Sequence, residues 1–159
     1  TIREMTTAMR RALLELTLLP ISMVSPFTRM VEPSAASGRA HDGRVIGLQF
    51  GGKWTEGTGA TENALCIGGH LTKIGTELEW TYDWDHPMRP WRVRTPDGEQ
   101  VDAVLKPTFD RYDVTDLKVL KMEVHQCFGT WSGRVIGDDG APVEFEGIRG
   151  FAEEARNRW

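Results

Sequence analysis

The chain has few of the residues that crosslink small secreted domains. Only two cysteines, Cys66 and Cys127, occur among its 159 residues, and neither forms a CxxC pair. Two cysteines are too few for a disulfide framework, so we expect two buried free thiols and a cytoplasmic location. The sequence has no run of about 18 apolar residues, which predicts that no segment spans a membrane. A net charge of -4 argues against nucleic acid as a partner.

Several catalytic and cofactor motifs are also missing. The four histidines are scattered without HxxxH or HxH spacing, so we expect no metal site. There is no GxSxG elbow, which argues against that type of serine hydrolase. The glycine-rich segment from Gly51 to Asn63 has neither phosphate-loop nor dinucleotide spacing, and we expect no cofactor. A Cys127–His125 nucleophile stays open, although the sequence shows no third group to orient it.

The start of the chain carries a helical pattern. Apolar residues recur at helical spacing over residues 2–19, and Pro20 ends the pattern, which predicts one amphipathic helix. We expect the helix to pack on the domain or on a second copy, and its arginines leave a membrane-surface or partner helix as the alternative. Residues 20–43 are typical of a proline-bearing linker. The chain begins at Thr1 and not at methionine, so we expect a fragment or a processed product.

From Arg44 onward the pattern changes to strands that are separated by turns. The predicted strands are 44–50, two within 62–75, 77–83, 91–95, 101–109, 117–137 and 142–151, and a short helical turn is expected after them. Gly68 and Gly69 predict a hairpin turn between the two strands of 62–75, and apolar and polar side chains alternate around Trp80 in 77–83. We expect Gly129 and Gly133 to bend the long strand over 117–137. Turn signals at about every 8–12 residues, together with seventeen glycines, favour an antiparallel barrel or sandwich. We therefore divide the chain into residues 1–36, with the helix and linker, and residues 37–159, with a mainly β domain.

The segment 117–128 alternates between polar and apolar side chains. Glu123 and His125 share one face with Cys127, while Gln126 shares the other face with Phe128. If the polar face lines a cavity, Glu123 and His125 are about 7 Å apart along its wall and form a candidate acid/base pair. Alternation by itself favours the opposite orientation, with the polar face in solvent.

Two further segments can border a pocket. In the glycine-rich segment, Trp54 can cap a pocket into which Glu56 or Glu62 points, and the alternative is a structured turn. The segment WDHPMRPW, residues 84–91, predicts an irregular loop at a barrel mouth or, alternatively, a surface loop that tryptophan packing anchors. Neither segment by itself defines a reaction.

Four segments, in this order, resemble the C-terminal half of a bacterial family called domain of unknown function 2804. They are SGRAHDGRVIGLQFGGKWTEGTGATENAL, HPMRPWRV, EVHQCFGTWSGRV and GFAEEARNRW, between Ser37 and Trp159. That family is related in fold to carotenoid hydratase-like and tocopherol cyclase-like proteins. The resemblance implies a lipocalin-like β-barrel, or a strongly curved sheet, with a cavity for a hydrophobic small molecule. Family members carry an N-terminal half that this sequence lacks, so a homodimer or a missing half is the expected partner.

The resemblance also implies a set of site residues. By position, the candidate catalytic residues are His125, Glu123 and Glu62, and the candidate ligand-binding residues are Trp54, Glu56, Thr58, Asn63, Trp91 and Gln126. It favours an inward orientation of the Glu123–His125 face. The expected function is binding of a terpenoid- or polyketide-like molecule, with acid/base chemistry such as hydration, isomerisation or cyclisation. The sequence leaves open whether a reaction is catalysed, and the alternative is a non-catalytic scaffold whose N-terminal helix mediates oligomerisation.

Overall fold

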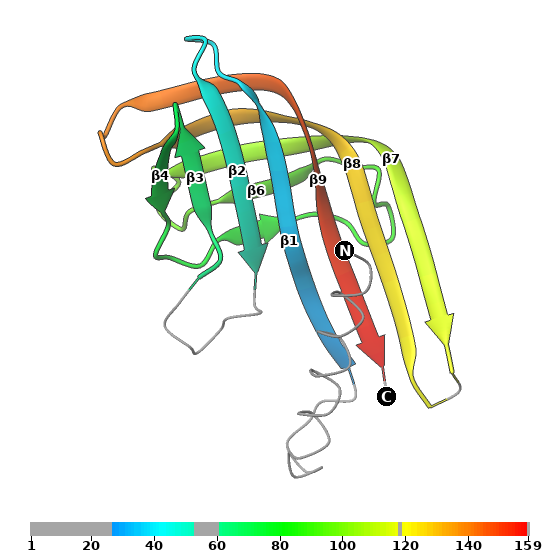
Figure 1. Cartoon of the computed structure of the whole chain (residues 1–159). Coiled ribbons are helices and arrows are strands. Elements are labelled where there is room, and N and C mark those ends of the chain that lie inside the picture. The colour runs from blue at the N-terminus through cyan, green and yellow to red at the C-terminus, as the bar shows by residue number, and fades with distance from the viewer. Residues whose placement is uncertain (1–26, 53–60, 118, 159) are drawn as a thin grey trace.

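The computed structural model describes residues 27–52, 61–117 and 119–158, which form one antiparallel sheet (Figure 1). Its strands are β1 (Phe27–Arg39), β2 (Val45–Gly52), β3 (Ala64–Ile67), β4 (His70–Lys73), β5 (Glu79–Thr81), β6 (Trp91–Arg94), β7 (Val101–Asp116), β8 (Lys121–Ile136) and β9 (Pro142–Arg158). Their order across the sheet is β4-β3-β2-β1-β9-β8-β7-β6-β5. The prediction of a mainly β, antiparallel domain is therefore confirmed.

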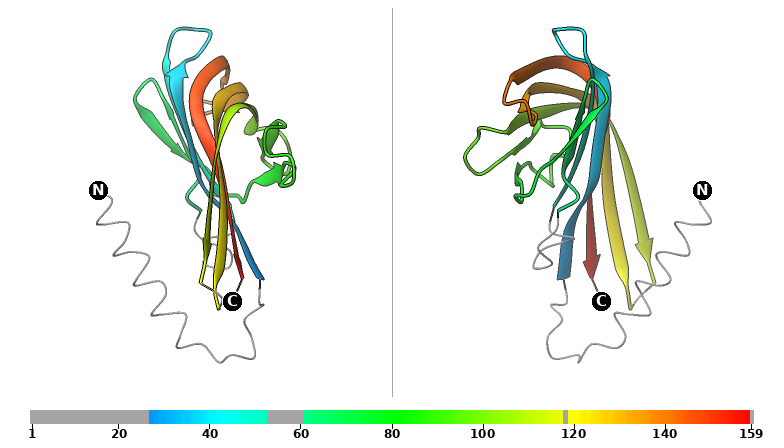
Figure 2. Two further views of the ribbon diagram at one scale, coloured as in Figure 1. Left: turned by 90° about the vertical axis from the view of Figure 1, so that its right-hand side faces the viewer. Right: turned by 60° about the vertical axis from the view of Figure 1, so that its left-hand side comes forward.

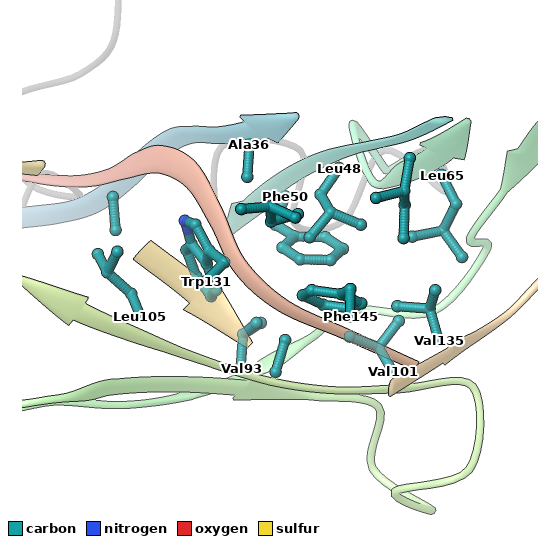
Figure 3. Close-up of a cluster of buried hydrophobic side chains, with 14 of the residues drawn as sticks. Ala36, Leu48, Phe50, Leu65, Val93, Val101, Leu105, Trp131, Val135 and Phe145 are labelled. Carbon is teal, nitrogen blue, oxygen red and sulfur yellow. The ribbon is translucent and has the colours of Figure 1, made fainter. Parts of the chain in front are cut away.

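The upper part of the sheet curls into a half-barrel, and its concave side holds the core (Figures 2 and 3). Trp131 on β8 packs edge-on against Phe50 of β2 at 6.1 Å and against Trp80 of β5 at 6.3 Å between ring centroids. Strands β2 and β5 lie on opposite sides of β8 in the strand order. Their side chains can meet on one tryptophan only because the sheet bends around it. The strongly curved sheet that the resemblance implied is the observed form.

Glycines allow this bend. A Cβ at Gly129 would lie 2.1 Å from the carbonyl oxygen of Lys106, so β7 and β8 can approach here only without a side chain. Bulges in the β7–β8 and β8–β9 pairings flank this point. Bulges increase the local bend and twist of a strand. The sequence-based expectation that Gly129 and Gly133 bend the long strand agrees with this geometry.

Below the curl, four strands continue side by side as a flatter ribbon that we call the strand extension (Figure 1). It comprises residues 27–33 of β1, 152–158 of β9, 121–127 of β8 and 110–116 of β7. Loop residues between β5 and β6 lie against its concave side near His125. The strand extension and this loop together position the candidate site.

Three sequence predictions are corrected by the strand bounds. Residues 27–39, which we expected in a linker, form β1, and Pro33 fits inside it because it lies at a bulge, where no ladder hydrogen bond is lost. Strand β7 continues past residue 109 to Asp116. The closing segment is strand and not a helical turn, because residues 153–158 pair with both β1 and β8.

The predicted helix at residues 2–19 lies outside the described residues. None of the segments that the structure describes forms a helix with the length and apolar character that crossing a membrane needs. By contrast, the predicted hairpin at Gly68 and Gly69 is confirmed. These two glycines join β3 to β4 with φ angles of 58° and 88°, values that favour glycine over other residues.

Candidate functional site

The polar face of β8 points to the concave side of the sheet. Cys127 and Trp131 are 0% and 1% exposed and belong to the core, and His125 lies on the same face by strand alternation. The inward orientation implied by the family resemblance is therefore the observed one. His125 and Glu123 lie on the part of this face that belongs to the strand extension.

His125 forms a dyad with Asp110 of the neighbouring strand β7. Its Nδ1 atom is 2.7 Å from Oδ2 of Asp110, and the two side chains are only 13% and 16% exposed. The pair is diagonal, because the register sets His125 opposite Tyr112 and Asp110 opposite Cys127. When Nδ1 donates its hydrogen to the carboxylate, Nε2 remains as the ring atom that can accept or release a proton.

Two aromatic rings enclose the imidazole of His125. Tyr112 stacks on it with ring centroids 4.7 Å apart, and Trp84 meets it edge-on at 4.4 Å. The guanidinium of Arg156 lies 4.0 Å from the centroid of Trp84, and its Nε donates to the fully buried Glu154. The rings of Trp84 and Tyr112 therefore form apolar walls around His125, and the Arg156–Glu154 pair supports the ring of Trp84.

Tyr112, which stacks on His125, links Glu123 to the dyad by a hydrogen bond. The phenol hydroxyl donates to Glu123 at 2.8 Å, and the ammonium of Lys121 lies 3.0 Å from the other carboxylate oxygen. The hydrogen bond from Tyr112 is the main cause that lowers the pKa of Glu123, and the bond from Lys121 adds to it. The same hydrogen bond raises the pKa of Tyr112. Glu123 thus lies beside His125 as an ionised acceptor and orients Tyr112.

Cys127 is a hydrogen-bond donor in this structure. Its Sγ atom is 3.4 Å from the carbonyl oxygen of Pro87 and 3.7 Å from Oδ1 of Asp110. Burial, followed by the charge of Asp110, raises the pKa of the thiol from 9.0 to about 12. A thiol that stays protonated at neutral pH is a poor nucleophile, which argues against the Cys127–His125 pair as a nucleophilic site.

The loop between β5 and β6 is anchored by Trp91. Its indole nitrogen donates to the carbonyl oxygen of Pro87 at 2.8 Å, and its ring stacks on Tyr82 at 4.2 Å. Within the loop, Asp83 accepts hydrogen bonds from His86 and Arg89. Trp91 is fully buried, so it holds the loop as a core residue, and Trp84 is the tryptophan of this loop that reaches His125.

Three predicted site residues lie away from the dyad. Gln126 is on the opposite face of β8, because neighbouring residues alternate, and donates to Glu153 at 2.5 Å. Asn63 is buried and structural, since it accepts from the Gly51 amide and donates to Thr76. Glu62 lies against Gly51, near the end of β2. The next residue, Gly52, is three strands from His125 in the pairing order, which is about 14 Å across the sheet. Glu62 therefore belongs to a part of the sheet that is distant from the dyad.

Trp54, Glu56 and Thr58 lie outside the described residues. Sequence reasoning missed five residues of the site: Trp84, Asp110, Tyr112, Glu154 and Arg156. For Asp110 and Tyr112 the sequence contains a signal that the strand continues past residue 109. Tyr112 and Val114 alternate with Arg111 and Asp113, as side chains on the two faces of a strand do. The partners of a strand residue across the sheet are set by register, which the sequence of one strand does not show.

Clusters of metal-binding side chains and surface hollows are the other places where a site could lie. Among the described residues there is no cluster of three or more His, Cys, Asp or Glu side chains that could hold a metal ion. A shallow hollow of about 510 Å³ lies on the convex side, where Arg92 and Asp102 form a bidentate ion pair. None of the predicted site residues lines it. The dyad therefore remains the best candidate for chemistry.

A search against protein-family models matches residues 32–159 to the family described as Domain of unknown function (DUF2804). The matched residues cover β2 to β9 and most of β1. Searches of curated proteins and of solved structures found no match.

Proposed function

The chain belongs to the family described as Domain of unknown function (DUF2804), and on that premise we propose that it binds an apolar small molecule and moves a proton on it. The family description names no reaction, so the proposal is supported by the residues themselves. The observation that carries it is the 2.7 Å Asp110–His125 pair on the concave face of the sheet. The ligand class we propose is terpenoid- or polyketide-like, as the family resemblance implies.

The dyad supports acid/base work at Nε2 of His125. The carboxylate of Asp110 fixes the tautomer through Nδ1 and stabilises the imidazolium that forms when Nε2 takes a proton. A positioned general base of this kind contributes roughly 10²–10⁴-fold to a rate. The apolar ligand would contact the rings of Trp84 and Tyr112, which flank the imidazole.

This chemistry favours isomerisation or hydration over cyclisation. In an isomerisation, Nε2 removes a proton from one carbon of an activated ligand, the C–H electron pair shifts the double bond, and the imidazolium returns the proton to another carbon. In a hydration, Nε2 takes a proton from water as the oxygen adds to an activated double bond, and then protonates the neighbouring carbon. Cyclisation of an unactivated alkene would need a stronger acid than an imidazolium.

We add two proposals, one on the location of the protein and one on the shape of its ligand-binding domain. Both cysteines are free thiols, and we propose a cytoplasmic location on that ground. We also propose that the curled sheet corresponds to part of a lipocalin-like barrel, as the resemblance implies. The concave side of such a sheet is where a small ligand would be enclosed.

Deuterium incorporation tests the proposed reaction. The protein is incubated in D₂O with a panel of terpenoid enols, enones and allylic alcohols, and products are followed by mass spectrometry. We expect a ligand whose uptake of deuterium, or of water, depends on His125. His125→Gln should lower the rate by about 10²-fold or more, because the base is lost. His70→Gln, which changes an exposed histidine on β4, is the matched control.

The outcome that contradicts the proposal is equally specific. If the His125→Gln and His70→Gln variants exchange deuterium at the same rate as the wild-type chain, His125 is not the base. Thermal unfolding of both variants shows whether the fold is kept, so that a loss of activity can be assigned to the site.

A further inference from the structure

A row of three phenylalanines crosses the convex side of the sheet at the upper end of the strand extension. Phe109 of β7, Phe128 of β8 and Phe151 of β9 lie side by side, with ring centroids 6.3 Å and 5.7 Å apart. The register pairs Phe128 with both of the others, and Phe128 follows the inward-facing Cys127, so the row faces outward. Phe109 is 58% exposed, and the other two residues are partly exposed. Apolar rings gathered at a surface point to a contact with another element or molecule.

The apolar surface continues below this row along the strand extension. Met122 and Val124 of β8 alternate with Glu123 and therefore share the outward face with Phe128. Ala155 of β9 pairs with Val124 on the same face. None of these residues, and none of the three phenylalanines, belongs to the core cluster on the concave side. Together they form a second apolar surface, which we call the convex apolar face: Phe109, Met122, Val124, Phe128, Phe151 and Ala155.

The described part of the chain supplies no second layer for this face. All nine strands belong to one sheet, and no described segment is a helix. The loop between β5 and β6 packs on the opposite, concave side through Trp84 and Pro87 (Figure 2). Gln126 donates to Glu153 within the convex face, so this polar pair is already satisfied and can be covered. A sheet face of this composition normally packs against a second layer.

The chain enters the sheet at the lower end of this face. Strand β1 begins at Phe27, which pairs with Arg158, and 26 residues precede it in the sequence. A helix over residues 2–19, as the sequence predicts, is about 27 Å long. The convex apolar face measures about 20 Å from Met122 to Phe128. Residues 20–26 span up to about 24 Å when extended, which is enough to reverse the chain and lay the helix along the face.

The predicted helix carries a stripe whose length and composition suit this face. The stripe is about 17 Å long, and its methionine sulfurs pack favourably against aromatic rings. The concave side of the strand extension would not suit it, because Asp110, Glu123 and Arg156 would lose water there without gaining partners. The residues of the stripe are Met5, Ala8, Met9, Ala12, Leu13 and Leu16.

We propose that residues 2–19 form a helix that packs its apolar stripe on the convex apolar face of the same chain. In this arrangement Leu16 lies near Met122 and Met5 lies near Phe128, because the helix runs back up the face from the start of β1. The helix is then the second layer behind β8, the strand that carries His125. The inference does not depend on the chemistry proposed for His125, and it assigns the helix to its own domain and not to a second copy.

Crosslinking between introduced cysteines tests the position of the helix in the full chain. Ala12→Cys is combined with Val124→Cys, and a short bismaleimide reagent is added. Two control pairs change one partner each: Leu14→Cys with Val124→Cys moves the helix position to the side opposite the stripe. Ala12→Cys with Val114→Cys moves the sheet position to the concave face, where Val114 is 47% exposed and pairs with Glu123. Peptide mapping by mass spectrometry separates these links from any at Cys66 or Cys127.

We expect the Ala12–Val124 pair to crosslink within one chain, at a yield at least about tenfold above either control, because only this pair brings two facing positions together. Equal yields for the three pairs, or no link in the first, would overturn the inference. A link that joins two chains would also overturn it, and would assign the convex apolar face to a contact between copies.

Thermal unfolding gives a second readout that needs no crosslink. Leu16→Glu places a charge in the proposed contact and should lower the melting temperature by roughly 5 °C. Leu14→Glu makes the same substitution on the opposite side of the helix and should leave the melting temperature nearly unchanged. Val124→Glu should act like Leu16→Glu, and the double variant should cost less than the sum of the two, because both remove one contact. Equal effects of Leu16→Glu and Leu14→Glu would contradict the proposed packing.

Discussion

The thiol of Cys127 and the carbonyl oxygen of Pro87 are 3.4 Å apart, although the two residues are 40 positions apart in the chain. The same sulfur lies 3.7 Å from the carboxylate of Asp110. One small side chain on β8 therefore joins the loop that carries Trp84 to Asp110 of the dyad on β7. This contact holds the aromatic wall against His125.

The first prediction concerns stability at high pH. In the unfolded chain the Cys127 thiol ionises near its ordinary pKa of 9.0, while in the folded chain it stays protonated up to about 12. The unfolded state then binds fewer protons, so the free energy of unfolding should fall as pH rises through this window, by at most about 1.4 kcal/mol per pH unit. Urea unfolding of the wild type and of Cys127→Ala should show a steeper fall for the wild type. Parallel curves for the two proteins would contradict the raised thiol pKa.

The second prediction concerns the carboxylate of the dyad. Asp110→Asn removes the charge that stabilises a protonated His125, and the amide no longer enforces the reactive tautomer. We expect deuterium transfer to fall by about 10²-fold or more with little change in fold. Asp113→Asn changes an exposed carboxylate on the opposite face of the same strand and serves as the control. Equal rates for the two variants would remove Asp110 from the mechanism.

The third prediction separates the two roles of Tyr112. Tyr112→Phe keeps the ring on His125 but removes the hydroxyl that donates to Glu123. The pKa of Glu123 should rise toward its ordinary value, because this hydrogen bond is the main cause that lowers it. A carboxyl titration by NMR measures this shift. Stability should change by less than about 1 kcal/mol, since both groups are partly exposed, and Tyr112→Ala should reduce ligand binding far more than Tyr112→Phe does.

The fourth prediction concerns the bend of the sheet. Gly129→Ala places a methyl group 2.1 Å from the carbonyl oxygen of Lys106, so the backbone of β7 or β8 must move. We expect a loss of about 3 kcal/mol or more in the free energy of unfolding. Gly75→Ala is the matched control, because a Cβ there meets no atom within 4 Å and the variant should be near neutral. Thermal unfolding measures both, and similar melting temperatures would show that the bend tolerates a side chain.

Much of the upper sheet could be predicted from local sequence. The hairpin at Gly68 and Gly69 and the alternation around Trp80 need only neighbouring residues, and both predictions agree with the structure. The residues of β1 could not be predicted in this way. Its proline, Pro33, and its small residues resemble a linker, and it is a strand because it pairs with β9 at the other end of the chain. Pairing between distant segments overrides weak local preference.

The features of the candidate site likewise divide into those that the local sequence predicted and those that it did not. Strand alternation was enough to put Glu123, His125 and Cys127 on one face and Gln126 on the other, because side chains alternate with a period of two. Only the tertiary structure decided that this face is concave, that Asp110 and Tyr112 meet His125, and that Trp84 closes over it. These contacts depend on the register of β7 against β8 and on the curl at Gly129, and both join residues that are distant in the sequence. The periodicity of one strand contains no information about either, so the sequence by itself determined the face and the three-dimensional packing determined its partners.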